Sequence, residues 1–289
     1  MFQKKIVWMA CRSYNYCVPT PFYHLSIAQS ILYQGVPLSN HQLILKHYGA
    51  FILGNTAPDV QIISRQSRQD THFFRLPLDH HAQSPWEVMF KRYPQLENLD
   101  EINSEQVAFL LGYLCHLQAD FLWVQTIFHP LFGPQLDWGS FPERLYLHNV
   151  LRAYLDAQIL PTLKSDIIVQ MQVVIPNQWL PFIKDDHLII WRDYLYEQLI
   201  PGAASRTVEV FASRQGLPTD DFNQLLSSES RMETEIFSRV SHSQLATYYH
   251  LIISQNHELI ESYIKKLGRI SSSTIENQEH ASSVIGRHP

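Results

Sequence analysis

The stretch 104–128, SEQVAFLLGYLCHLQADFLWVQTIF, decides the fold because apolar side chains occur nearly all round the helix that it predicts. A helix that is hydrophobic on every side is buried in the core of a large protein or in a membrane. No stretch of the chain reaches the roughly 18 consecutive apolar residues of a transmembrane span. We therefore expect a core helix and no transmembrane segment, and its polar exceptions, His116, Gln118 and Asp120, become the informative residues.

Helical patterns also dominate the rest of the chain. In SPWEVMFKRY, Ser84 is placed as an N-cap, Pro85 at the first helical position, and Glu87 completes a capping box. The β-branched segment 165–175 has strand propensity, but it lies among helices, so we expect a helix there as well. The fold class is therefore all-α, a single multi-helix domain. Further helices are expected at 22–34, 41–53, 141–160, 187–199, 203–214 and 230–267.

Composition narrows the functional classes. The 289 residues are 45% hydrophobic with a net charge of −5, which indicates a compact globule without the basic surface that bulk nucleic-acid binding requires. Three cysteines without a CxxC motif, Cys11, Cys17 and Cys115, suit a reducing, cytoplasmic location. The apolar run near the amino terminus is too short for a secretory signal. We expect an N-terminal extension at 1–17 and a disordered tail at 271–289.

One local pattern points to metal binding. His116 and Asp120 stand four residues apart on the same helical face, where an imidazole and a carboxylate can reach one divalent ion. Taken alone, the pair is weak evidence for a metal, because a buried His–Asp hydrogen bond or a helix-surface pair is the commoner reason for this spacing. Three more candidates precede it: His24 in PTPFYHLSIAQSIL (19–32), Asp59 in GAFILGNTAPDV (49–60) and His72 in DTHFF (70–74). An acid or imidazole held on a loop against a core is a common ligand.

The order and context of these motifs resemble the zinc-dependent phospholipase C family, which is related in fold to S1/P1-type nucleases. The resemblance covers residues 18–125 well and continues more weakly through ERLYLHNVLRAYLD. It implies a zinc-binding helical core at 18–160, with additional helices packed on it at 161–270. It also implies one zinc ligated by His72, His116 and Asp120, a second zinc bound by His24 and bridged by Asp120, and Asp59 as a ligand or as the catalytic group that orients the bound water.

Two features of the chain depart from that family. Its enzymes hold a third zinc with a histidine soon after the H-x-x-x-D motif and a later H-x-x-x-E or H-x-x-x-D pair. Here the further candidates are His129, nine residues beyond Asp120, and His148, which is followed four residues on by Arg152, a side chain that cannot ligate a metal. Each histidine is either a ligand or a structural residue, so two zinc ions are expected and a third stays open.

The second departure is at His24. Secreted members use a free terminal amine as a ligand beside the first histidine, whereas His24 follows 23 residues. A water, another side chain or a later chain start would have to complete that coordination. The expected function is hydrolysis of a phosphodiester, in a small molecule or a phospholipid, by a zinc-activated water. The alternative is a non-catalytic or degenerate helical protein that keeps part of the metal site for structure or partner binding.

Overall fold

The structure is a computed structural model that describes residues 18–33, 41–79, 82–98 and 102–285, with side chains up to residue 268. Within these ranges every regular element is a helix, which confirms the all-α prediction. The expected N-terminal extension, with Cys11 and Cys17, lies outside the described residues. Val18, where the helical core is expected to begin, is buried.

The central element is α8 (Ser104–Trp123), in which every residue from Val107 to Asp120 is buried. It continues through a π-helical turn, η4 (Val124–Phe128), into α9 (His129–Phe132). Among the described residues, Ser104–Phe132 is the one helical stretch that passes a membrane-span test on length and hydropathy, and 94% of the tested window is buried inside the protein. A buried helix of this kind has the character of a core helix.

The core forms where other helices pack against α8, above all α4 (Tyr48–Gly54), which meets it backbone to backbone. A Cβ atom on Gly112 would lie 2.1 Å from the Phe51 carbonyl oxygen, and one on Gly54 would lie 2.0 Å from the Phe109 carbonyl oxygen. Only glycine permits this approach. The other elements that precede α8 in the chain are α2 (Pro21–Tyr33), α3 (His41–Lys46), η2 (Ala57–Val60), α5 (Gln61–Ser64), α6 (Arg68–His72), α7 (Pro85–Arg92) and η3 (Pro94–Glu97).

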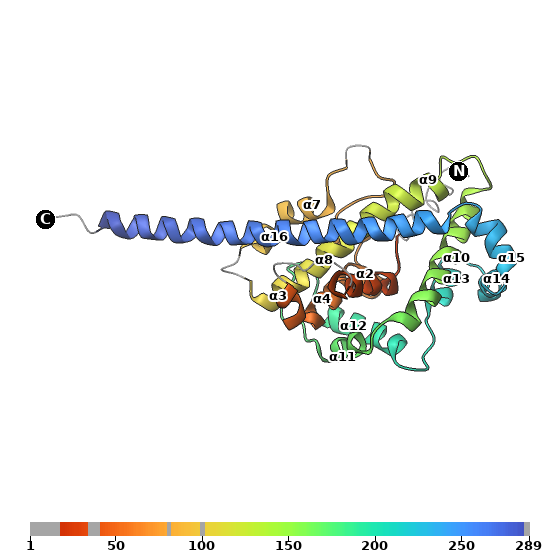
Figure 1. Cartoon of the computed structure of the whole chain (residues 1–289), viewed down its shortest axis with the longest axis horizontal. Coiled ribbons are helices and arrows are strands. Elements are labelled where there is room, and N and C mark those ends of the chain that lie inside the picture. Colours follow the sequence, from red (N-terminus) through yellow and green to blue (C-terminus); the bar gives the residue numbers. More distant parts are fainter. Residues whose placement is uncertain (1–17, 34–40, 80–81, 99–101, 286–289) are drawn as a thin grey trace.

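The C-terminal half of the chain surrounds this core. In Figure 1, α10 crosses one end of the body, and α11 packs against α4 and α12 along one side. Residues 165–173 of the segment 165–175 are helical, as expected, and form α11. These elements are α10 (Phe141–Ile159), η5 (Leu160–Thr162), α11 (Ser165–Val173), α12 (Asp185–Leu199), α13 (Thr207–Gln215), α14 (Thr219–Leu226), α15 (Glu229–Arg231) and the π-helical turn η6 (Met232–Phe237).

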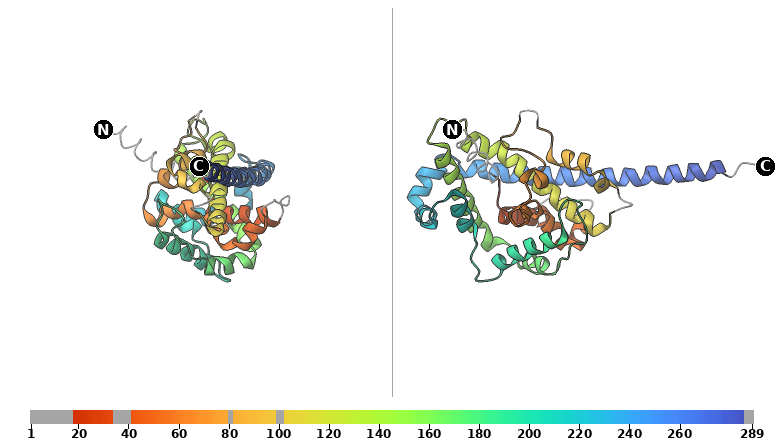
Figure 2. Two further views of the ribbon diagram at one scale, coloured as in Figure 1. Left: turned by 90° about the vertical axis from the view of Figure 1, so that its left-hand side faces the viewer. Right: turned by 180° about the vertical axis from the view of Figure 1, so that it is seen from behind.

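The last helix, α16 (His242–Ile285), packs on α8 and α2 and then extends well beyond the body, as the views in Figures 1 and 2 agree. It runs through residues 271–285, where the sequence predicts a disordered tail. The apolar periodicity ends there, and the segment from Ser271 to Ile285 contains no glycine or proline. The helix expected at 230–267 is divided, because α15 and η6 precede the start of α16.

The helix start at Pro85 is confirmed, but the capping box expected there does not form. Ser84 occupies the N-cap position of α7 without a capping hydrogen bond from its side chain. A complete box occurs instead at α10, where Ser140 Oγ accepts from the Glu143 amide at 3.3 Å and Glu143 Oε2 accepts from the Ser140 amide at 3.2 Å. The residue pattern permits a capping box, and the side-chain conformations decide whether it forms.

Candidate metal centre

The fold brings together all five residues that the sequence singles out as principal ligands. They come from four elements: α2 supplies one, η2 one, the end of α6 one, and α8 two. Four of the five are completely buried, and the fifth, Asp59, is 6% exposed. Residues up to 96 positions apart in sequence therefore meet in one enclosed site. The five are His24, Asp59, His72, His116 and Asp120.

Asp120 lies at the centre of this His–Asp cluster. Its Oδ1 is 3.1 Å from His24 Nε2, and its Oδ2 is 3.3 Å from His72 Nε2 and 3.6 Å from His116 Nε2. Asp59 Oδ1 lies 3.5 Å from His72 Nε2 on another side of the cluster. Three imidazoles and two carboxylates thus direct their ligand atoms toward a common space, which is the donor set that zinc prefers.

The orientation of two imidazoles is set from outside the cluster. His116 Nδ1 donates to the Asn55 carbonyl oxygen at 2.8 Å, which directs the other ring nitrogen inward. Thr71 Oγ1 donates to the Arg68 carbonyl oxygen and accepts from His72 Nδ1 at 2.9 Å. A hydrogen bond of this kind on the outer nitrogen is how proteins fix the tautomer of a metal-binding histidine.

His24 is held differently. Its ring stacks on the ring of His116 with centroids 3.8 Å apart and planes 19° from parallel. Its Nδ1 is buried and has no hydrogen-bond partner among the described residues, whereas Nε2 contacts Asp120. A buried ring nitrogen without a partner is costly unless something else binds it. The unpartnered ring nitrogen of His24 is therefore consistent with a histidine that binds a metal ion.

The backbone of both ligand-bearing loops is anchored by side chains from core helices. Trp191 Nε1 of α12 donates to the Thr56 carbonyl oxygen at 2.9 Å, within the turn that leads to Asp59. Tyr113 of α8 donates to the Thr71 carbonyl oxygen at 2.5 Å, next to His72. These buried hydrogen bonds hold irregular backbone against the core, so that the two loop ligands have defined positions.

Sequence reasoning missed one charged group of the site, Arg68. Its Nη2 lies 2.5 Å from Asp120 Oδ2, and its guanidinium carbon is 4.5 Å from the centre of the Phe74 ring. Arg68 and His72 are four residues apart on α6, so they lie on the same helical face, as His116 and Asp120 do on α8. This spacing from a candidate ligand is the sequence feature that could have identified Arg68. The site therefore contains an internal cation beside its central carboxylate.

The pKa values in the cluster reflect strong coupling between acids and imidazoles. Burial and the charge of Arg68 lower the pKa of His72 to about 4. Burial acts to raise the pKa of Asp120, but His116 and His24 outweigh it and hold that pKa well below its usual range. Burial likewise opposes a charge on His116, yet Asp120 raises the pKa of this imidazole above its ordinary value. Asp120 is thus ionised, and His116 favours a proton when no metal replaces it.

The histidines considered for a third zinc do not join the cluster. His148 Nε2 accepts from Trp123 Nε1 at 3.0 Å, and the rings of Phe128 and Phe132 lie 5.0 and 5.2 Å away. His129 is the first residue of α9, half-buried, on the helical continuation of α8. Nine residues of helix carry it roughly 13 Å beyond Asp120 along the axis.

The described part of the chain offers two sets of side chains that could each hold an ion. Within each set the ligand atoms lie within 4.8 Å of one another. One set, His72, His116 and Asp120, is the same trio that the resemblance implies for one zinc. The other set contains His24, Asp59 and His116. In this set His24 shares an ion with Asp59, whereas the family resemblance implies that it shares one with Asp120. His129 and His148 belong to neither set.

An all-helical domain around a buried His–Asp cluster is typical of a helical metal-binding protein. A comparison of the chain with family models identifies the family. The model for zinc dependent phospholipase C matches residues 20–276, which include all five cluster residues. The chain belongs to this family. No curated protein and no solved structure matches it. Family membership and the two candidate ligand sets together support a metal-dependent, phospholipase-like hydrolase.

Proposed function

We propose that this protein hydrolyses a phosphodiester, in a small molecule or a phospholipid, with zinc held in the His–Asp cluster. The observation that carries the proposal is the meeting of His72 Nε2 and His116 Nε2 at 3.3 Å beside the Asp120 carboxylate. With both outer nitrogens bonded away from the cluster, the inner nitrogens face each other, and either a proton or a metal ion between them stabilises this arrangement. The separation of the two nitrogens also suits zinc. Two nitrogens at about 2.1 Å from a tetrahedral zinc would be roughly 3.4 Å apart.

The proposal includes two ions. His72, His116 and Asp120 would hold the first, and His24 and Asp120 would hold the second. Zinc bound there would lower the pKa of a coordinated water and stabilise charge on the phosphoryl oxygens. Asp59 is the member of the cluster with residual exposure, at 6%, so its carboxylate is placed to meet that water and accept its proton or to ligate the first ion. A reducing, cytoplasmic location is also proposed, supported by the free, buried thiol of Cys115.

One observation favours the alternative, a non-catalytic protein that keeps part of the site for structure or partner binding. Arg68 Nη2 lies 2.5 Å from Asp120 Oδ2, the oxygen that also faces His72 and His116. A guanidinium in that position neutralises part of the charge that a metal would otherwise balance. In this alternative Arg68 stabilises the cluster, and the protein has no hydrolytic turnover.

Metal analysis combined with a hydrolysis assay separates the two functions. The purified protein is assayed for zinc and then for hydrolysis of bis(4-nitrophenyl) phosphate before chelation, after chelation, and after zinc is restored. Bound zinc with turnover that chelator abolishes and zinc restores is the expected result. Bound zinc without chelator-sensitive turnover would establish the non-catalytic alternative, and a protein that does not bind zinc would overturn both.

A further inference from the structure

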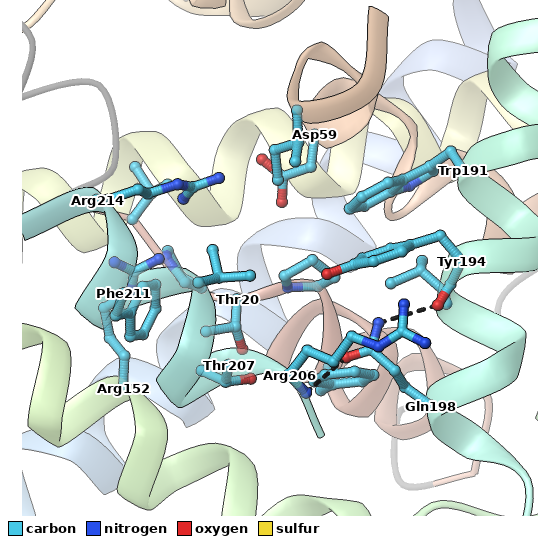
Figure 3. A pocket seen from close by; sticks show the side chains of 17 residues that line it. Thr20, Asp59, Arg152, Trp191, Tyr194, Gln198, Arg206, Thr207, Phe211 and Arg214 are labelled. Carbon is cyan, nitrogen blue, oxygen red and sulfur yellow. Dashed lines mark hydrogen bonds between the residues drawn. The ribbon is translucent and has the colours of Figure 1, made fainter. Parts of the chain in front are cut away.

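A pocket adjoins the His–Asp cluster at Asp59. It encloses about 570 Å³ of empty space, part of it open to solvent, and Asp59 is the one cluster residue in its lining. Figure 3 shows the Asp59 carboxylate facing this space. The remaining lining comes from residues 18–22, from Ile62 of α5, from α12, from Arg152 of α10, and from the segment 206–214 that contains most of α13. A substrate whose phosphodiester lies beside Asp59 would therefore place a neighbouring group in this pocket.

Most of the side chains that line the pocket are apolar or aromatic. They come from every element of the lining except α10, so apolar surface faces the space from several sides. Water in such a space is replaced favourably by an apolar group of a ligand. These residues are Val18, Pro19, Pro21, Phe22, Ile62, Trp191, Tyr194, Leu195, Val210 and Phe211.

The uncharged polar side chains of the lining already have partners within the protein. The hydroxyls of Thr20 and Thr207 both donate to the carboxylate of Asp156, which lies outside the lining. Gln198 Nε2 donates to a backbone carbonyl oxygen of α12 at 2.9 Å, and its Oε1 accepts from the backbone amide that precedes α13 at 2.8 Å. Because these groups are satisfied, a ligand does not need polar atoms to compensate them.

Two arginines of the lining are engaged as well. Arg152 Nη1 donates to Asn149 Oδ1 at 2.9 Å, and the guanidinium interacts electrostatically with the buried carboxyl of Asp156. Arg206 Nη2 pairs with Glu197 Oε2 at 3.0 Å. An anion in the pocket would have to compete with these partners, so the lining does not favour a second anionic group on the substrate.

The aromatic rings of the pocket are also in use. The rings of Trp191 and Tyr194 stack with centroids 5.7 Å apart and planes 20° from parallel. The guanidinium carbon of Arg206 lies 5.3 Å from the centre of the Tyr194 ring, and that of Arg152 lies 4.3 Å from the centre of the Phe211 ring. A nucleobase binds by stacking on an open aromatic face, whereas an aliphatic group needs only apolar contact. The pocket therefore favours an aliphatic group.

The volume of the pocket suits one aliphatic chain. A methylene group takes about the space of a water molecule in the liquid, roughly 30 Å³, so a chain of 12 carbons needs about 360 Å³. Two chains of that length would need about 720 Å³, which is more than the 570 Å³ of the pocket. A second chain would stay outside.

We propose that this pocket binds one aliphatic chain of the substrate, so that the protein acts on a phosphodiester that carries a single chain of up to about 12 carbons beside the scissile group. This step rests on the proposed function, in which Asp59 serves the metal centre and the scissile diester lies beside it. The metal centre would bind the phosphodiester, and the pocket would select the chain. A nucleotide would gain no comparable contact, because it offers no aliphatic chain to the apolar lining.

The test measures binding, so that it does not depend on turnover. Isothermal titration calorimetry on the zinc-saturated protein compares butyl, hexyl, octyl, decyl, dodecyl and tetradecyl phosphate, each below its critical micelle concentration. All carry the same charge, so differences in affinity report on the chain alone. Each buried methylene should tighten binding about two- to fourfold, so octyl phosphate should bind at least about 16-fold more tightly than butyl phosphate. The affinity should level off near dodecyl phosphate, where the pocket is full.

A matched pair of variants assigns the chain to the pocket. Val210 lines the pocket from α13 and is half-buried. In Val210→Trp the preference for octyl over butyl phosphate should fall to within about fourfold, because the indole occupies the space of several methylenes. Butyl phosphate should bind as it does to the wild type. The control is Val208→Trp, since Val208 is also half-buried on α13 but lies outside the lining, and it should keep the full preference.

A second pair of variants covers the case in which Val210→Trp does not fold, which circular dichroism detects. Ile62→Trp fills the pocket from α5, and Ile63→Trp is its control, because Ile63 is half-buried on the same helix and lies outside the lining. The same loss of preference is expected in Ile62→Trp and not in Ile63→Trp.

The proposal is overturned if affinity does not rise with chain length, or if the preference for octyl over butyl phosphate survives in the folded pocket variants. It is also overturned if the rise continues unchanged to tetradecyl phosphate, since the chain would then lie on a larger surface. These outcomes are distinct from failure of the proposed function, which appears as the absence of chelator-sensitive hydrolysis of bis(4-nitrophenyl) phosphate. A protein without turnover can still be scored for its dependence on chain length.

Discussion

His72 and His116 face each other across 3.3 Å through their Nε2 atoms, although they lie 44 residues apart in the chain. The outer nitrogen of each ring is bonded elsewhere, to Thr71 in one case and to the Asn55 carbonyl oxygen in the other. Two inward lone pairs at this distance repel each other unless a proton or a metal ion lies between them. Asp120 raises the pKa of His116 above its ordinary value, so a proton on this imidazole is favoured when no metal is bound.

Replacing one of these imidazoles should abolish metal binding. In His116→Gln, we expect zinc content to fall and hydrolysis of bis(4-nitrophenyl) phosphate to drop at least about 100-fold. Mutation of residues that only hydrogen-bond to a metal ligand costs up to about 100-fold, so loss of a ligand itself should cost at least as much. His250→Gln is the control, because His250 lies exposed on α16 away from the cluster. Zinc analysis and initial rates provide the measurements. Unchanged zinc content in His116→Gln would remove this histidine from the ligand set.

Zinc binding should release protons. The pKa of His116 is raised by Asp120 against the effect of burial, so the metal-free cluster holds a proton that zinc must displace. The affinity for zinc should therefore decrease as the pH falls through the raised pKa of His116. Titration calorimetry at one pH in two buffers with different ionisation enthalpies measures the number of protons released. Zinc affinity that does not change between pH 8 and pH 6 would contradict the prediction.

The close contact of α4 and α8 should be intolerant of any side chain. A Cβ atom at Gly112 would lie 2.1 Å from the Phe51 carbonyl oxygen and 2.8 Å from the Asn55 amide nitrogen. Gly112→Ala should therefore cost about 3 kcal/mol or more of unfolding free energy, since overpacking against rigid backbone forces the helices apart. It should also weaken zinc binding, because Asn55 is displaced from His116.

Urea denaturation and zinc analysis measure both effects of Gly112→Ala. Gly268→Ala on α16 is the matched control, because a Cβ atom there meets nothing within 4 Å. That substitution should stabilise the protein slightly, by at most about 1 kcal/mol, since alanine favours helix over glycine. A Gly112→Ala protein as stable as the wild type would show that the two helices can separate without cost.

Asp156 should make the protein less stable as the pH rises from 4 to 6. Burial raises the pKa of Asp156 to about 6, despite hydrogen bonds from Thr20 and Thr207. Between the unfolded value near 3.9 and the folded value, the native state therefore binds more protons than the unfolded state. Stability then decreases with increasing pH across this window, by up to about 3 kcal/mol.

Asp156→Asn removes this titration and provides the comparison. Urea unfolding of both proteins at pH 4, 5, 6 and 7 gives the difference in their unfolding free energies at each pH. The difference should shift in favour of the variant as the pH rises. If the difference is the same at every pH, the carboxyl of Asp156 titrates alike in the folded and unfolded states.

Much of the fold could be predicted because helical periodicity is a local property. The starts of α7 and α10 follow proline and N-cap signals, and the helical state of residues 165–173 follows from their neighbours. One prediction failed because it depended on side-chain conformation and not on the local residue pattern. The Ser84–Glu87 box is possible by residue type but is not formed.

The sequence by itself predicted the all-α fold class from helical periodicity, and it singled out His116 and Asp120 by their spacing and His24, Asp59 and His72 by motif order and the resemblance to a known family. Only the tertiary structure decided how those residues are oriented and what surrounds them. The Asn55 carbonyl oxygen that orients His116 is a backbone group and has no residue signature. Arg68 beside Asp120, and the pocket at Asp59, combine side chains that are distant in the chain and adjacent only after folding.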